Sequence, residues 1–241
     1  PDDKAHKLFE LPEYVKKMQE NKWLGDKTKQ GFYKKIKGAD GKSEILALDL
    51  NTFEYKAQQK INSSTLQATK LVDNLRERMK VFSKGTDKAG EFFRTSFFGL
   101  FEYVSDRIPE ISDELYRIDD AMRAGFGWEL GPFEVWDSLG IRNAVEGMKK
   151  YGNEAASWVH EMLAAGHESF YVVENGVKKY YDIPSKSYQS VPGSEAFLIL
   201  DNIRPTHTIW KNSGTTITDL GDGILNLEIH TKMNTIGGEV I

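Results

Sequence analysis

The sequence predicts a mainly α-helical fold with β-hairpin appendages, and three observations lead to this prediction. Between residues 64 and 165, apolar residues recur at helical spacing in several consecutive segments. Outside that region, short runs alternate apolar and polar residues around turn-forming glycines, which is typical of hairpins. Of the 241 residues, 39% are hydrophobic and 28% are charged, so the chain can bury a core.

Charge and composition exclude several functional classes. The net charge of −4 offers no basic surface for nucleic acid or an anionic membrane, so we expect neither as a partner. The chain has no cysteine, and no apolar run approaches the roughly 20 residues that a membrane helix needs. A cytoplasmic location is therefore expected. Pro1 is not a start methionine and Ile241 closely follows a glycine pair, so we interpret both ends as cuts through a longer polypeptide.

Helices are predicted from apolar spacing and from the placement of proline and glycine. Pro132 suits the first turn of a helix, and Gly140 suits its end. The predicted helices cover residues 8–22, 64–82, 89–105, 110–124, 132–140, 141–150 and 153–165. The helix over 89–105 has a broad aromatic face, made of Phe92, Phe93, Phe97 and Phe101. We interpret this face as core or as the interface of a homodimer, in preference to a channel for a fatty-acyl chain.

Hairpins are predicted on both sides of the helical region. Strands over 32–36 and 45–50 flank a turn at 38–41, and residues 169–183 turn at Asn175-Gly176. A last hairpin covers residues 215–230, after a polar connector over 184–214. The first two hairpins are followed by similar segments, Asp49-Leu50-Asn51-Thr52-Phe53-Glu54-Tyr55 and Asp182-Ile183-Pro184-Ser185-Lys186-Ser187-Tyr188. This similarity predicts an internal repeat, with coincidence between two similar hairpins as the alternative.

Two motifs resemble the C-terminal domain of L-3-hydroxyacyl-CoA dehydrogenases. The first is Gly25-Asp26-Lys27-Thr28-Lys29-Gln30-Gly31-Phe32-Tyr33, which is similar to the Gly-x-Lys-Thr-x-x-Gly-Phe-Tyr sequence at the end of that domain. The second joins Ile118-Asp119-Asp120-Ala121-Met122 to Gly131-Pro132-Phe133-Glu134 and Asp137-x-x-Gly140, and it resembles the middle of the domain. A third similarity links residues 220–234 to the opening strands of the enoyl-CoA hydratase (crotonase) fold, and it implies that Lys232 could contact CoA in a complete hydratase domain.

The resemblance implies a domain organisation and a function for the parent polypeptide. Residues 1–60 would be the tail of a first dehydrogenase C-terminal module, 61–190 a complete second module, 191–214 a connector, and 215–241 a truncated hydratase start. The parent would oxidise L-3-hydroxyacyl-CoA with NAD bound by an upstream domain. No Gly-x-Gly-x-x-Gly follows a strand in this chain, so we expect it to bind no cofactor itself.

This chain by itself is predicted to be catalytically inactive. The family places a substrate-positioning Asn in a Gly-Phe-x-x-Asn-Arg stretch, where this chain has Thr95 at the Asn position and Ser96 at the Arg position. Asp119, Asp120 and Asp137 could act as paired acid–base carboxylates, but helix capping is the favoured interpretation. The histidines lack the spacing of a metal site. The lysines near the first motif fit a solvated loop better than a site for CoA phosphates, and they are Lys27, Lys29, Lys34 and Lys35.

Alternative functions remain open at this level. The helical repeat could be a non-catalytic dimerisation scaffold, or it could bind acyl-CoA without any chemistry. The residues upstream of Pro1 would discriminate the enzyme from the scaffold, because a strand followed by a glycine-rich turn would indicate a nucleotide domain.

Overall fold

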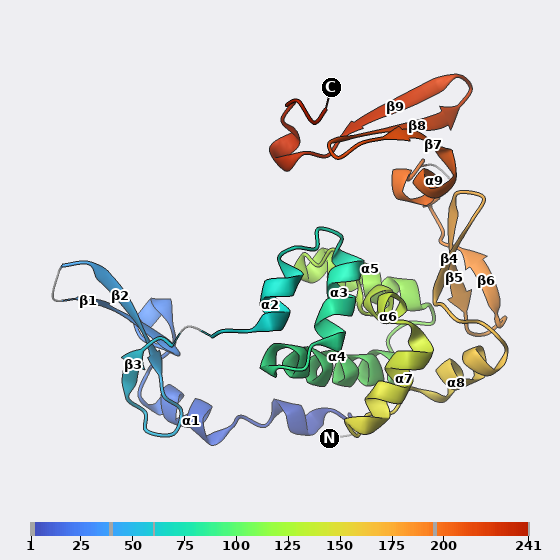
Figure 1. Cartoon of the computed structure of the whole chain (residues 1–241). Helices are drawn as coiled ribbons and strands as arrows, with labels where there is room; N and C mark the ends of the chain where they lie inside the picture. Colours follow the sequence, from blue (N-terminus) through green and yellow to red (C-terminus); the bar gives the residue numbers. More distant parts are fainter. Residues whose placement is uncertain (1–2, 39–40, 60, 195–196, 241) are drawn as a thin grey trace. The chain divides into compact units, whose positions relative to one another are not determined.

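The computed structural model describes residues 3–38, 41–59, 61–194 and 197–240, and the chain divides into two compact units (Figure 1). The first unit is Pro1–Ser63 and the second is Ser64–Ile241. Each sheet formed by the described residues has three antiparallel strands in sequential order. The chain is therefore a mixed helical and β structure.

The first unit pairs a short helix with a sheet. Its elements are η1 (His6–Phe9), α1 (Glu13–Glu20), η2 (Asp26–Thr28), β1 (Tyr33–Lys37), β2 (Ser43–Leu48) and β3 (Tyr55–Ala57). The helix predicted over 8–22 is interrupted by Pro12, because a proline disfavours the helical conformation of the residue before it. The predicted turn at 38–41 includes residues 39–40, which lie outside the described residues.

The second unit is helical from Ser64 to Ala164, which confirms the predicted helical bundle. Its helices are α2 (Ser64–Thr69), α3 (Leu75–Lys84), α4 (Lys88–Asp106), α5 (Leu115–Phe126), α6 (Pro132–Leu139), α7 (Ile141–Lys150), α8 (Ser157–Ala164) and α9 (Leu200–His207). The single helix predicted over 64–82 is wrong, since Asn74 caps a new helix by accepting a hydrogen bond from the Glu77 N–H. No helix in the described ranges is long and apolar enough to cross a membrane.

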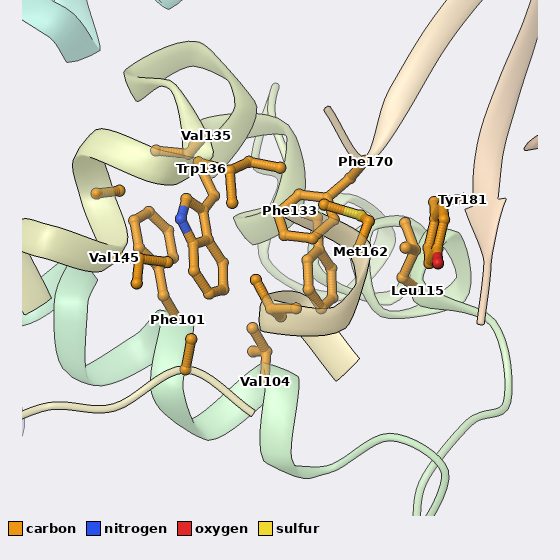
Figure 2. Close-up of a cluster of buried hydrophobic side chains, with 14 of the residues drawn as sticks. Phe101, Val104, Leu115, Phe133, Val135, Trp136, Val145, Met162, Phe170 and Tyr181 are labelled. Atoms are coloured by element: carbon orange, nitrogen blue, oxygen red, sulfur yellow. The ribbon is translucent and has the colours of Figure 1, made fainter. Parts of the chain in front are cut away.

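The core of the second unit is built around α6, against which α3, α4 and α5 pack. Figure 2 shows its aromatic centre, where the Trp136 ring stacks on Phe101 with centroids 4.7 Å apart. Phe170 meets Phe133 edge-on at 5.0 Å. Full burial of such a side chain contributes roughly 1.5–3 kcal/mol. The predicted aromatic face of α4 is thus largely core, while Phe92 remains 75% exposed.

The second unit also contains two sheets, β4 (Tyr171–Glu174), β5 (Val177–Asp182) and β6 (Ser187–Ser190), and then β7 (Thr208–Lys211), β8 (Thr215–Gly221) and β9 (Ile224–Ile229). The hairpins at Asn175-Gly176 and over 215–230 are confirmed. The prediction of two-stranded appendages is wrong, because each hairpin gains a third strand. In the predicted connector, β6, α9 and β7 form instead.

Hydrogen bonds support the predicted internal repeat. Tyr55 donates its hydroxyl to the carbonyl of Gly31 at 2.5 Å, and Tyr188 donates to that of Ser169 at 2.7 Å. Tyr55 of β3 and Tyr188 of β6 therefore each bond to the residue just before an aromatic pair. That pair is Phe32-Tyr33 before β2 in the first unit and Phe170-Tyr171 before β5 in the second. The main chain also matches, since the N–H groups of residues 48 and 181 donate to the carbonyls of residues 32 and 170. This shared bonding favours a repeat over coincidence between two similar hairpins, and the repeat stays a prediction.

Candidate functional site

The second family-like motif folds into one buried contact between α5 and α6. Asp119 is fully buried, and it accepts hydrogen bonds from the N–H groups of Phe133 at 2.9 Å and Glu134 at 3.2 Å. The hydroxyl of Tyr171 donates to the same carboxylate at 2.8 Å. A Cβ on Gly131 would lie 2.3 Å from Asp119, so the close approach requires glycine. The geometry is that of a helix cap supplied from a neighbouring helix.

Glu134 is the centre of a charge cluster. The residue is 3% exposed, and its carboxylate accepts hydrogen bonds from the Lys178 ammonium at 2.6 Å and from the Gly131 N–H at 3.0 Å. The guanidinium of Arg123 donates to it as well, and Arg76 lies 3.5 Å away. The cluster therefore joins α3, α5, α6 and β5 through one carboxylate.

Asp137 connects α6 to the sheet. Its two carboxylate oxygens accept the N–H groups of Phe170 at 2.7 Å and Tyr171 at 2.9 Å, immediately at the start of β4. Gly140 then ends α6 with φ +81°, a conformation that favours glycine, and allows α7 to begin at Ile141.

Burial and nearby positive charge shift the pKa values of these carboxyl groups in opposite directions. Burial raises the pKa of Asp119 and of Asp137 to about 7, although the N–H donors at each carboxylate partly oppose it. Burial also acts to raise the pKa of Glu134. The positive charge and hydrogen bond of Lys178, then the Gly131 N–H and Arg123, outweigh that effect and leave the pKa lowered. All three carboxylates accept hydrogen bonds on both oxygens, which favours the capping interpretation over acid–base catalysis.

A cavity of about 820 Å³ opens beside this cluster. Its lining includes Arg76, Arg123, Glu134 and Lys178, together with residues of α9. Because both cationic and acidic residues line this cavity, its lining does not favour a ligand of one charge sign.

The first motif forms a closed loop before β1. The Gly25 N–H donates to the carbonyl of Gln30 at 2.8 Å, and Gly25 has φ +92°. The Thr28 hydroxyl accepts the Leu24 N–H at 2.9 Å and lies 3.0 Å from the Gln30 carbonyl oxygen. A Cβ on Gly31 would lie 2.8 Å from the Gly25 Cα. The remaining motif residues, Lys27, Phe32 and Tyr33, are exposed.

The other predicted positions lie apart from the cluster. Thr95 is exposed on α4, and Lys232 is exposed in η4 (Lys232–Asn234). Glu134 was predicted only as part of the second motif, without its charged partners. The partners lie 11, 44 and 58 positions away along the chain, so no local pattern could have revealed them.

Residues 108–169, which contain Asp119, Glu134 and Asp137, match the family "3-hydroxyacyl-CoA dehydrogenase, C-terminal domain". This segment is homologous to the C-terminal domain of 3-hydroxyacyl-CoA dehydrogenases. The dehydrogenase-like segment thus includes the cap between α5 and α6, and it lies between the end of α4 and the start of β4.

Curated relatives extend the similarity along the chain. All 241 residues align at 37% identity with a probable 3-hydroxyacyl-CoA dehydrogenase of Bacillus subtilis (strain 168), and the chain spans 30% of that protein. A putative fatty acid oxidation complex trifunctional enzyme of Rickettsia felis is 29% identical over 151 residues, which are 59% of this chain and 19% of that protein. The corresponding Rickettsia prowazekii protein is 24% identical over 141 residues, 58% of this chain and 18% of that protein. No solved structure matches the chain significantly.

Dehydrogenases of this family use NAD. A dinucleotide site of the usual kind needs a parallel sheet with a glycine-rich turn between a strand and a helix. The sheets formed by the described residues are antiparallel, and those residues place no such turn between a strand and a helix. They therefore do not fit the cofactor, and no step of hydride transfer is attributed to them.

Proposed function

We propose that this chain is the helical C-terminal part of a NAD-dependent L-3-hydroxyacyl-CoA dehydrogenase polypeptide of fatty-acid β-oxidation. The parent would convert L-3-hydroxyacyl-CoA to 3-oxoacyl-CoA, and an enoyl-CoA hydratase domain would begin near residue 215. The main support is the buried cap from Asp119 to the start of α6, which lies in the matched segment and uses the residues of the family-like motif.

The role of this part is support rather than chemistry. It holds a rigid aromatic core, and the position that resembles the family's Asn carries Thr95. We propose that it stabilises the acyl-CoA cleft formed with the upstream domain and mediates homodimerisation. The rival proposal of a non-catalytic scaffold predicts the same core without any activity in the parent.

The decisive experiment uses the full-length polypeptide that contains this sequence. NADH formation, followed by absorbance, is expected with L-3-hydroxybutyryl-CoA or a longer L-3-hydroxyacyl-CoA and not with the D-enantiomer. Loss of the crotonyl-CoA absorbance measures the hydratase separately. A folded polypeptide that forms no NADH from L-substrates of any chain length would favour the scaffold, whatever the hydratase result.

A further inference from the structure

The predicted repeat includes the short helices that precede the first two sheets, α1 and α8, which are labelled in Figure 1. Both helices have eight residues. In the first unit, the Trp23 N–H closes α1 by donating to the Met18 carbonyl at 2.8 Å. In the second, the His167 N–H closes α8 by donating to the Met162 carbonyl at 3.1 Å. The assembly of α1 with β1–β3 therefore corresponds to the assembly of α8 with β4–β6.

In the second unit, this assembly packs on α6 of the helical bundle. The Phe170 ring is fully buried, and it meets the Trp136 ring edge-on with centroids 5.2 Å apart (Figure 2). The Asp137 carboxylate of α6 accepts the N–H groups of Phe170 and Tyr171. The bundle thus holds the start of the sheet through an aromatic pocket and one carboxylate.

The corresponding face of the first unit is uncovered. Phe32 corresponds to Phe170 but is 49% exposed, and Tyr33 corresponds to Tyr171 but is 61% exposed. The ring of Tyr14 on α1 meets the Phe32 ring at 6.4 Å and leaves the rest of it open. Among the residues that the structure describes, no carboxylate accepts the N–H of Phe32 or of Tyr33.

Two simpler explanations do not account for this uncovered face. The loop between α1 and β1 is longer than the loop between α8 and β4, yet it leaves Phe32 and Tyr33 exposed. Single exposed aromatic residues are common on protein surfaces and indicate no partner by themselves. Here, however, the pair repeats the register of a pair that contacts the bundle, because Tyr33 faces Ala47 as Tyr171 faces Tyr180.

We propose that the face formed by Phe32 and Tyr33 packs on a second helical bundle, which precedes Pro1 in the parent polypeptide. Chain order gives this position, because α3–α6 precede α8 and their counterparts would precede α1. The Bacillus subtilis relative, of which this chain spans 30%, is long enough to include such a bundle.

The chemistry of this partner follows from the contacts in the second unit. The partner would provide an apolar pocket for the Phe32 ring and a carboxylate for the two N–H groups. The proposal rests on the parent polypeptide of the proposed function, but not on its enzymatic activity.

Hydrogen exchange tests the proposal in the full-length polypeptide, with the 241-residue chain as the reference. The amides of Phe32 and Tyr33 should exchange about a hundredfold more slowly in the full-length polypeptide, because a buried and hydrogen-bonded N–H exchanges only through local opening. The amides of Phe170 and Tyr171 are the internal control, and they should exchange slowly in both polypeptides. Equal exchange of Phe32 and Tyr33 in the two polypeptides would overturn the proposal.

A photo-crosslinker identifies which segment covers the face. In the full-length polypeptide, p-benzoylphenylalanine in place of Tyr33 should capture a segment before Pro1 of the same molecule. Position 52 is the control, since Thr52 and its counterpart Ser185 are both exposed turn residues whose N–H groups bond to an aspartate. The crosslinker in place of Thr52 should not capture that segment.

Three outcomes at position 33 would refute the upstream bundle: capture of a second molecule, capture of a segment after Ser63, or no capture. The enzymatic assay remains separate. A polypeptide that forms no NADH but gives the upstream crosslink would remove the proposed function and leave this inference standing.

Discussion

At the scale of single residues, Glu134 shows how one buried charge can connect distant segments. Its carboxylate is nearly inaccessible, yet Arg76, Arg123 and Lys178 bring three positive charges to it. Burial of a carboxylate costs free energy unless it is paired and hydrogen-bonded. The three cationic side chains are partly exposed to solvent, which reduces the free-energy cost of leaving them without their partner.

Replacement of Glu134 tests this role. Glu134→Gln should lower the free energy of unfolding by roughly 2–4 kcal/mol, because it leaves several half-buried cations facing an uncharged amide. Urea denaturation followed by circular dichroism measures this loss. Glu77→Gln removes a carboxylate that pairs with Lys80 at an exposed position, and it should cost less than about 1 kcal/mol. A similar cost for both variants would contradict the importance of the cluster.

The buried carboxyl group of Asp137 should make the stability of the chain depend on pH. Burial raises its pKa in the folded chain from the ordinary 3.8 to about 7, so between these values the folded state holds a proton that the unfolded state has released. Stability should therefore decrease as pH rises from about 4 to about 7, by an amount on the order of a few kcal/mol. Asp137→Asn should flatten this part of the profile. Parallel stability profiles for the wild type and the variant, measured by denaturation across this range, would contradict the raised pKa.

At the scale of elements, the start of α6 requires a glycine at position 131. Gly131→Ala would place a Cβ 2.3 Å from Asp119 and push the capping carboxylate away from the Phe133 N–H. We expect this variant to lose roughly 2–4 kcal/mol of stability, through overpacking and the weakened cap.

Gly125 provides a matched control in the last turn of α5. A Cβ there meets nothing within 4 Å, and Gly125 does not have a positive φ. Gly125→Ala should therefore stabilise the chain by roughly 0.5–1 kcal/mol, because alanine favours the helix. Thermal melts of the two variants should thus shift in opposite directions, and shifts of the same sign would refute the packing argument.

At the scale of the whole molecule, the buried core lies within one part of the chain. The residues of the main hydrophobic cluster run from Phe93 to Tyr181, all in the second unit. In the described part of the first unit, Met18 and Leu48 are the buried hydrophobic residues. A unit with so little buried apolar surface gains little stability by itself.

We therefore expect residues Ser64–Ile241 to fold when produced without the first unit. The shortened chain should keep the near-ultraviolet circular dichroism of its packed aromatic residues and a cooperative thermal transition. Its midpoint should lie within a few degrees of the transition of the full chain, because the core residues are retained. A broad transition without aromatic signal would show that the first unit is required for the core.

Phe92 provides a test of dimerisation, because it belongs to the predicted aromatic face of α4 and is exposed. Phe92→Glu should convert a dimer to a monomer in size exclusion with light scattering, because a charge there would oppose burial in an interface. Glu91→Gln changes the adjacent exposed residue and should leave the dimer intact. A monomeric wild-type chain at tens of micromolar would remove the dimerisation proposal.

The features that depend on neighbours along the chain were predictable from the amino-acid sequence alone. Apolar spacing indicated the helices of the second unit, Pro132 and Gly140 marked the ends of α6, and Asn175-Gly176 marked a hairpin. Asn74 and Glu77 also form a local capping pattern, so the break between α2 and α3 was predictable in principle. These features follow from local backbone preferences, which a few residues are enough to express.

The folded chain determines which residues far apart in sequence come into contact. It brought Glu134 to Lys178, placed Phe93 in the core while Phe92 stayed exposed, and added β3 and β6 to their hairpins. The physical reason is that such contacts depend on the packing of elements far apart in sequence, and periodicity within one element carries no information about its partners.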